Sequence, residues 1–247
     1  MSTLGMIKQA HISEGLRFFR EPFMQKYRLR PYYNQHEPLA IFSPCRNEDY
    51  MIYLRHKGPV MVVWCGSDGM YISEAMAKLL KSREAVHVAS SAFLSADLTR
   101  WGIPHKIVPN TPVIPVYDPH PLGDCIYHYG TPKSDFYKNS WIPEIQERTG
   151  IEVISTHKNS YSKAELKEIY KRCFVALRLT DHDGLPTTCV EMGLMGRPSI
   201  HNGDIPHGYK YKTIDDVVRI IKEIEIDPDK VARDWMEFLS CDDWLNL

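Results

Sequence analysis

Short apolar runs alternate with stretches of helical periodicity along most of the chain, and this alternation limits the possible folds more than any other feature. The runs LAIFS (39–43), PVMVVWCG (59–66) and AVHVAS (85–90) are each followed by a segment with apolar residues at helical spacing. Parallel strands need a crossover connection, which is usually a helix, so the alternation predicts parallel sheets. Residues 1 to about 37 show no clear pattern of this kind.

The alternation is interrupted once, at PNTPVIPVYDPHPLGD (109–124), which carries five prolines and little periodicity. Such a segment is typical of a linker between two domains. Strand-like runs and helical stretches then resume from CIYHYG (125–130) onward. The sequence therefore predicts an α/β protein with two Rossmann-like, doubly wound parallel-sheet lobes. The expected boundaries are 1–110 for the first lobe, 111–123 for the linker, 124–226 for the second lobe and 227–247 for a C-terminal helix.

The composition of the chain argues against several classes of partner and indicates the compartment in which the protein works. Thirty basic residues face 31 acidic ones in a chain of 247, so the net charge of −1 gives no general reason to expect nucleic acid or an anionic membrane surface. The six cysteines include no CxxC pair, which argues against a zinc site and favours free thiols in a reducing compartment. No apolar run is long enough for a membrane span, and the N-terminus lacks the apolar centre of a signal peptide. We expect a cytoplasmic protein.

The segment LRLTDHDGLPTTCVE (177–191) is the clearest candidate for a binding site. A buried strand leads into a polar loop, and a helix is expected to begin near Pro186. Ligands of open parallel sheets bind at the carboxyl ends of strands, and a helix start offers unpaired amides that suit a phosphate. Gly184 would allow close approach of an anion, and Glu191 could accept hydrogen bonds from sugar hydroxyls. The alternative is that Asp183 caps the helix, Gly184 serves the turn and Glu191 is a solvated helix residue.

This segment resembles the C-terminal nucleotide-sugar motif of GT-B glycosyltransferases, especially the retaining family-four type. Asp183 is followed eight positions later by Glu191, and Gly196-Arg197-Pro198 comes after a small-residue helix end, as in that family. The stretch HVASSAFLSADLTRWGIPHKIVPNTPV resembles the end of the family's N-terminal lobe. The resemblance covers roughly residues 85–224 and is strongest at 161–206. The chain is short for this architecture, so we expect a reduced N-terminal lobe.

The resemblance implies a role for each residue of the motif. Asp183, where the family usually has Glu, would face the donor hexose, and Glu191 would bind the nucleotide ribose. Backbone amides between them would hold the diphosphate, although Pro186 has no N–H to donate. The donor-binding residues expected from the motif and its surroundings are His182, Gly184, Leu185, Pro186, Thr187 and Glu191, with His201 near the phosphate.

The family places an Arg and a Lys after the first strand of the C-terminal lobe, where they neutralise the departing diphosphate. Thr131 occupies the Arg position here. Lys133 and Lys138 are the nearest candidate cations, and Lys158 or Arg178 could substitute for them. A solvated surface lysine is the alternative for each lysine.

In the N-terminal lobe, Gly66, Ser67 and Asp68 follow the apolar run PVMVVW. Small residues at this strand end could line the cleft where donor and acceptor meet, and Asp68 could orient an acceptor hydroxyl. Arg46 follows the preceding strand. The alternative is a tight turn in which Asp68 caps the next helix.

The resemblance implies a metal-independent, cofactor-free glycosyltransferase that moves a sugar from a UDP- or GDP-linked donor to a glycan or other hydroxyl acceptor, with retention. The first lobe would then face the acceptor, the second would bind the nucleotide-sugar, and the C-terminal helix would pack back on the first. Two alternatives share the fold: a nucleotide-sugar-binding subunit without turnover, and a nucleotide-sugar epimerase. The triplet Asp181-His182-Asp183 is an alternative metal site.

Overall fold

The computed structural model describes residues 7–132, 135–157 and 161–240 and divides into two compact units. Unit 1 contains the described residues up to Ile114, the segment Asp183–Leu185 and the last described residues from Leu239. Unit 2 contains Pro115–His182 and Pro186–Phe238. Each unit has one sheet, and all strand pairs in both sheets are parallel. The predicted α/β fold with two Rossmann-like parallel sheets is confirmed.

The sheet of unit 1 has six strands in the order β2-β1-β3-β4-β5-β6. Side chains of its central strand β4 alternate between two cores: Val62 and Trp64 face one, and Met61 and Val63 face the other. This period of two follows from the pleat of a strand, and a strand buried on both faces reads as one apolar run. The strands are β1 (Gln9–Ile12), β2 (Arg30–Pro31), β3 (Leu39–Phe42), β4 (Val60–Trp64), β5 (Val86–Ala89) and β6 (Lys106–Ile107).

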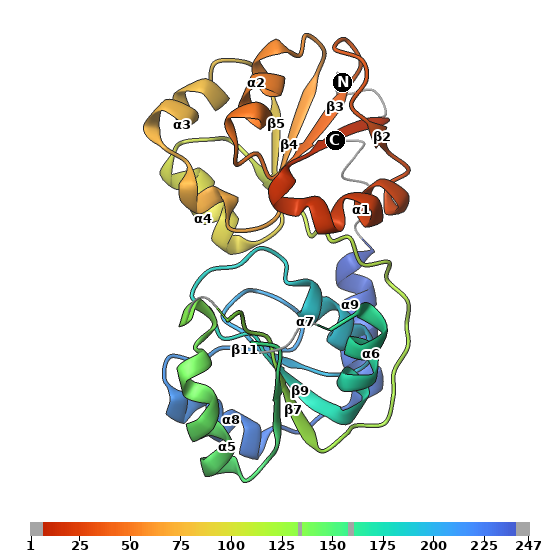
Figure 1. Ribbon diagram of the computed structural model, residues 1–247, viewed down its shortest axis with the longest axis vertical. Coiled ribbons are helices and arrows are strands. Elements are labelled where there is room, and N and C mark those ends of the chain that lie inside the picture. Colours follow the sequence, from red (N-terminus) through yellow and green to blue (C-terminus); the bar gives the residue numbers. More distant parts are fainter. Residues whose placement is uncertain (1–6, 133–134, 158–160, 241–247) are drawn as a thin grey trace. The chain divides into compact units, whose positions relative to one another are not determined.

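Helices cover both faces of this sheet (Figure 1). Helices α2, α3 and α4 pack on the face that holds Trp64, and α1 packs on the other through Phe23. Ser73 and Ser91 start α3 and α4 by accepting hydrogen bonds from backbone amides of the first turn. The helices are α1 (Arg20–Lys26), α2 (Asn47–Arg55), α3 (Glu74–Leu80) and α4 (Ala92–Arg100), with the 3-10 helices η1 (Glu14–Phe19) and η2 (Asp68–Tyr71).

The sheet of unit 2 has five strands in the order β11-β10-β9-β7-β8. Strand β9 lies at its centre between β10 and β7, and its apolar run is buried except at Phe174. The strands are β7 (Cys125–His128), β8 (Val153–Ser155), β9 (Cys173–Leu177), β10 (Ser199–Ile200) and β11 (Gly208–Tyr209).

Helices α5 and α8 cover one face of this sheet, and α6 and α7 cover the other (Figure 1). Helix α9 packs against α7 at Gly193, where an added Cβ would lie 2.0 Å from the indole Nε1 of Trp235. Only glycine permits this approach of the two helices. The helices are α5 (Ile142–Thr149), α6 (Lys163–Arg172), α7 (Thr187–Leu194), α8 (Ile214–Glu223) and α9 (Pro228–Leu239), with the 3-10 helices η3 (Asp135–Tyr137) and η4 (Asn139–Trp141).

Candidate functional site

The strands of unit 2 run in one direction, so the residues that follow them gather at one edge of the sheet. Tyr129 follows β7, Arg178 follows β9 and His201 follows β10. The loop from Thr180 to Pro186 leaves the same edge and leads into α7. Because ligands of open parallel sheets bind at the carboxyl ends of the strands, this edge is the candidate donor site.

The loop before α7 is ordered by its own hydrogen bonds. Thr180 Oγ1 donates to the carbonyl oxygen of His182 at 2.9 Å, and Asp183 Oδ1 accepts from the amide of Gly184 at 2.9 Å. The N-cap residue of α7 is Pro186, which forms no side-chain capping hydrogen bond, and Asp183 lies three residues before it. The first-turn amides of α7, which begins at the half-buried Thr187, have no acceptor within the helix and so suit an anion.

Glu191 lies on α7 and is half-buried rather than solvated. Its Oε2 accepts a hydrogen bond of 3.2 Å from the hydroxyl of Tyr170 on α6. Burial raises the pKa of Glu191, while the Tyr170 hydroxyl and the charge of Lys163 act in the opposite direction. A neighbouring helix thus restrains the carboxylate of Glu191.

Arg178 is the cation most firmly placed at the carboxyl edge of β9, and it is only 8% exposed. Its guanidinium carbon lies 4.0 Å from the ring centroid of Tyr129 and 4.4 Å from that of Tyr137. The Nη2 atom also donates to the Tyr137 hydroxyl at 3.3 Å. Stacking on two rings fixes a planar charge in one orientation, which a lysine could not match.

The other candidate cations differ in their placement. Lys138, the residue before η4, forms an ion pair with Asp181 in the loop before α7, and its Nζ lies 3.0 Å from Asp181 Oδ2. Lys133 and Lys158 lie outside the described residues. His201 is fully buried, and its Nδ1 lies 3.2 Å from the carbonyl oxygen of Arg178. This contact ties the ends of β9 and β10 together.

In unit 1, Gly66, Ser67 and Asp68 form the turn that follows β4. Asp68 Oδ1 accepts from the amide of Gly66 at 2.8 Å, so the carboxylate closes this turn. Its Oδ2 is buried and has no hydrogen-bond partner among the described residues. Burial raises the pKa of Asp68 to about 6, and the amide of Gly66 offsets part of this effect. A buried carboxyl with one unpaired oxygen at a strand end is suited to accept a proton or bind a hydroxyl.

A second polar cluster, which no sequence pattern indicated, lies at the carboxyl edge of unit 1. His11, the penultimate residue of β1, places Nε2 2.6 Å from Oδ1 of Asp49, the third residue of α2. Asp49 Oδ2 accepts from the Ser13 hydroxyl at 2.7 Å and from the amides of Cys45 at 2.9 Å and Arg46 at 2.8 Å. Asp49 was hidden inside a helical stretch, and His11 lies in the segment without a readable pattern. Arg46 itself is exposed.

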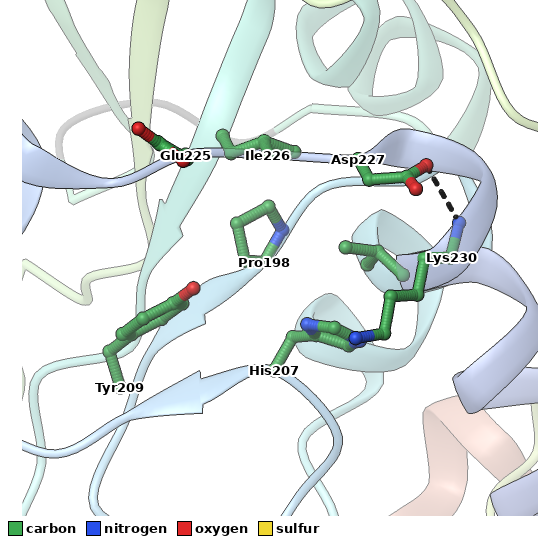
Figure 2. Close-up of a pocket in the computed structure, with 8 residues that line it drawn as sticks. Pro198, His207, Tyr209, Glu225, Ile226, Asp227 and Lys230 are labelled. Atoms are coloured by element: carbon green, nitrogen blue, oxygen red, sulfur yellow. Dashed lines mark hydrogen bonds between the residues drawn. The ribbon is translucent and has the colours of Figure 1, made fainter.

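A separate cavity of about 420 Å³ lies in unit 2 at the opposite, amino end of β10 and β11 (Figure 2). The Asp227 carboxylate beside it accepts a hydrogen bond of 3.1 Å from the amide of Lys230 and so starts α9. His207 places Nε2 2.7 Å from Asp234. This cavity is distinct from the carboxyl edge where the motif lies. Its lining residues are Pro198, His207, Tyr209, Glu225, Ile226, Asp227, Lys230 and Val231.

In residues 7–132, 135–157 and 161–240, no three His, Cys, Asp or Glu side chains are grouped as a metal ion would require. None of the helices in these ranges has both the length and the apolar character of a membrane span.

Known proteins match this chain in fold and not in sequence. No protein-family model matches the chain, and no curated protein matches it. Among solved structures, sucrose-phosphate synthase from Thermosynechococcus elongatus matches with a TM-score of 0.52 and 12% identity, over 90% of this chain and 72% of that one. A mutant of S. aureus TarM, solved with fondaparinux, α-GlcNAc-glycerol and UDP, matches with a TM-score of 0.53 and 9% identity, over 90% and 54%. The chain has a GT-B-like fold.

The fold resemblance predicted from residues 85–224 is thus confirmed, and it extends to nearly the whole chain. The chain spans about half the length of TarM, at 54%. At identities of 9% and 12%, the similarity concerns the fold alone.

Proposed function

We propose that the protein is a glycosyltransferase that moves a hexose from a nucleotide-diphosphate-sugar to a hydroxyl acceptor such as a glycan. The observation that carries this proposal is the placement of Glu191 on α7, where Tyr170 restrains its carboxylate after a polar loop at the carboxyl edge of the sheet. A restrained carboxylate on a helix whose N-terminus follows the carboxyl edge of the sheet suits a ribose joined to a diphosphate. The GT-B-like fold supports the same assignment.

In this proposal the chain stabilises the departing diphosphate with fixed positive groups and amides. The amides at the start of α7 bind the phosphates, and Arg178 and Lys138 supply positive charge from the neighbouring strand end and loop. Asp183 faces the donor sugar, and Glu191 takes the ribose hydroxyls. Preorganised charges of this kind need no rearrangement when the bond between the anomeric carbon and the phosphate breaks.

The donor is a UDP- or GDP-linked sugar in this proposal, and transfer needs no metal or other cofactor. The resemblance implies retention of the anomeric configuration. One reaction tests both metal independence and retention. Addition of a chelator shows whether transfer requires a metal, and proton NMR of the product gives its anomeric configuration.

The first experiment is a thermal-shift series of the purified protein with UDP-, GDP- and dTDP-sugars, because a ligand that binds only the native state raises the melting temperature. The corresponding free sugars, without nucleotide, serve as controls. We expect one nucleotide series to raise the melting temperature, and the same donor then to be consumed when acceptor sugars are added. No shift with any donor would contradict the proposal.

A second candidate function follows from Thr131, which stands where the family has the Arg of its cation pair. A chain without that charge could bind a nucleotide-sugar without turning it over. Donor binding with neither transfer nor hydrolysis would identify such a binding subunit, and interconversion of the donor sugar would identify an epimerase.

A further inference from the structure

The cavity of about 420 Å³ at the amino end of β10 and β11 lies within unit 2 and takes no part in the proposed transfer. The candidate donor site occupies the opposite, carboxyl edge of the same sheet. A volume of this size falls within the range of about 300–1,000 Å³ that is typical of small-ligand pockets. In Figure 2, Tyr209 and His207 lie on one side of Pro198, and the segment from Glu225 to Asp227 lies on the other. The cavity is therefore a candidate for a second binding site.

Two hydrogen-bond donors on the wall of this cavity are unpaired within the described part of the chain. No described residue forms a hydrogen bond with the hydroxyl of Tyr209 on β11 or with the ammonium group of Lys230 on α9. Polar groups on a cavity wall that lack protein partners are bound by water or by a ligand. A ligand of this cavity can therefore accept hydrogen bonds from Tyr209 and Lys230.

His207 adds an acceptor from a strained position. Its φ of 50° lies in the left-handed region, which residues other than glycine seldom occupy. The Nε2 atom lies 2.7 Å from Oδ2 of Asp234 on α9, and because a carboxylate only accepts, Nε2 donates and Nδ1 of the neutral ring keeps its lone pair. No described residue forms a hydrogen bond with this Nδ1. Strained residues of this kind concentrate at ligand sites, which favours binding over a merely structural role.

The charges and the apolar groups of the lining narrow the class of ligand. The carboxylates of Glu225 and Asp227 outnumber the single ammonium group of Lys230, so a phosphate or sulfate is disfavoured. A hydrocarbon would leave the donors and the acceptor without partners. The hydroxyl groups of a sugar both donate and accept, and the C–H faces of its ring suit apolar groups such as Ile226 and the ring of Tyr209.

We propose that this cavity is a saccharide-binding site that takes a neutral segment of a glycan. The ring of Tyr209 packs on the sugar, its hydroxyl and Lys230 donate to sugar oxygens, and Nδ1 of His207 accepts from a sugar hydroxyl. Binding is reversible and involves no covalent step. The site goes beyond the proposed function, because it holds a glycan whether or not the carboxyl edge transfers a sugar to it.

Saturation-transfer NMR and titration calorimetry of the full chain test the site. Maltose, cellobiose and chitobiose serve as neutral ligands, and inositol hexakisphosphate serves as an anionic one. No donor is added, so the result does not depend on transfer. We expect at least one disaccharide to bind with a Kd in the millimolar range. If none of the disaccharides binds, or if only inositol hexakisphosphate binds, the proposal is overturned.

Two variants locate the bound disaccharide. Tyr209→Leu keeps an apolar side chain in β11 but removes the ring, and Lys230→Ala removes a donor at an exposed position of α9. Each change is expected to lower the affinity about 10-fold. Lys222→Ala, at an exposed position of α8, is the matched control and should keep the wild-type affinity. Wild-type affinity in both cavity variants would place the disaccharide elsewhere and overturn the proposal.

Urea unfolding and donor binding complete the test. If Tyr209→Leu lowers the unfolding midpoint, Lys230→Ala decides the outcome alone. Both cavity variants should keep the thermal shift that a nucleotide-sugar gives the wild type. A wild type that binds a disaccharide in this cavity but no nucleotide-sugar would refute the proposed function and leave the cavity site intact. Binding of a nucleotide-sugar without binding of any disaccharide would do the reverse.

Discussion

Tyr170 of α6 donates a hydrogen bond of 3.2 Å to Oε2 of Glu191 on α7, and these two residues are 21 positions apart. No described residue donates a hydrogen bond to Oε1, the other oxygen of this half-buried carboxylate. The neighbouring helix therefore fixes the direction of the carboxylate while one of its oxygens can still accept from a ligand.

Glu191→Ala is expected to weaken nucleotide binding by about 10- to 100-fold, which corresponds to hydrogen bonds to a charged group worth roughly 1.5–3 kcal/mol. The measurement is titration calorimetry with the nucleotide that stabilises the wild type. Glu168→Ala is the matched control, because Glu168 lies on α6 with a side chain that is 70% exposed. Equal affinity of Glu191→Ala and the control would show that the carboxylate does not bind the nucleotide.

The parallel sheets could be predicted from the sequence because their central strands are buried on both faces. PVMVVW and FVAL have apolar residues at successive positions, and such runs between helical stretches leave few other folds. QAHI could not be recognised as β1, although it pairs with β3 along four residues. Its polar residues Gln9 and His11 are satisfied by partners distant in sequence, such as Asn34 and Asp49, which no local pattern reveals.

The candidate site was predictable only where its residues lie close together in the sequence. The loop before α7 and Glu191 fall within one segment, so their spacing could be read directly. Glu191 is restrained by Tyr170, and Arg178 is restrained by Tyr129 and Tyr137, all of which come from other elements. In the sequence, nothing distinguishes these tyrosines from aromatic residues that only pack in a core. The positions of such partners depend on strand order, which periodicity does not determine.

Arg178→Lys is expected to lower the transfer rate on the order of 10²-fold, because an ammonium cannot stack between two rings or keep the direction of the guanidinium. Steady-state kinetics with the preferred donor measure the effect. Arg219→Lys, at a side chain 57% exposed on α8, is the control. If both variants turn over at the wild-type rate, a different cation neutralises the diphosphate, and Lys138→Ala is the next test.

Asp68→Asn is expected to change how stability depends on pH. The pKa of Asp68 is raised from 3.8 to about 6 in the folded chain, so the folded state holds its proton after the unfolded state has lost it. The stability linked to this proton is present below about pH 4 and is lost as the pH rises through 6. The cost of ionisation is on the order of 2–3 kcal/mol, and asparagine avoids it.

Urea unfolding of the wild type and Asp68→Asn at pH 4 and pH 7 measures this difference. We expect the variant to gain stability relative to the wild type between the two pH values, because only the wild type has the Asp68 carboxyl, which ionises in this range. Asp215→Asn, at a side chain 76% exposed, is the control. A constant difference between Asp68→Asn and the wild type would show that Asp68 does not titrate in this window.

Arg197→Lys is expected to destabilise unit 2 by about 3–5 kcal/mol, although the charge is kept. The guanidinium is fully buried and donates only to backbone carbonyl oxygens. These carbonyls belong to the ends of α6 and α7, the start of β9 and the segment that leads into unit 2, namely Tyr170, Lys171, Cys173, Met195, His120 and Pro121.

A lysine has three donors on one nitrogen and cannot reach carbonyls spread around a planar fork, so several buried acceptors would lose their partners. Urea unfolding followed by circular dichroism measures the loss, with Arg148→Lys on the exposed face of α5 as the control. We expect a lower midpoint for Arg197→Lys and no change for the control. An unaltered midpoint would mean that the carbonyls find other donors, and that this arginine does not hold the two helices to the sheet.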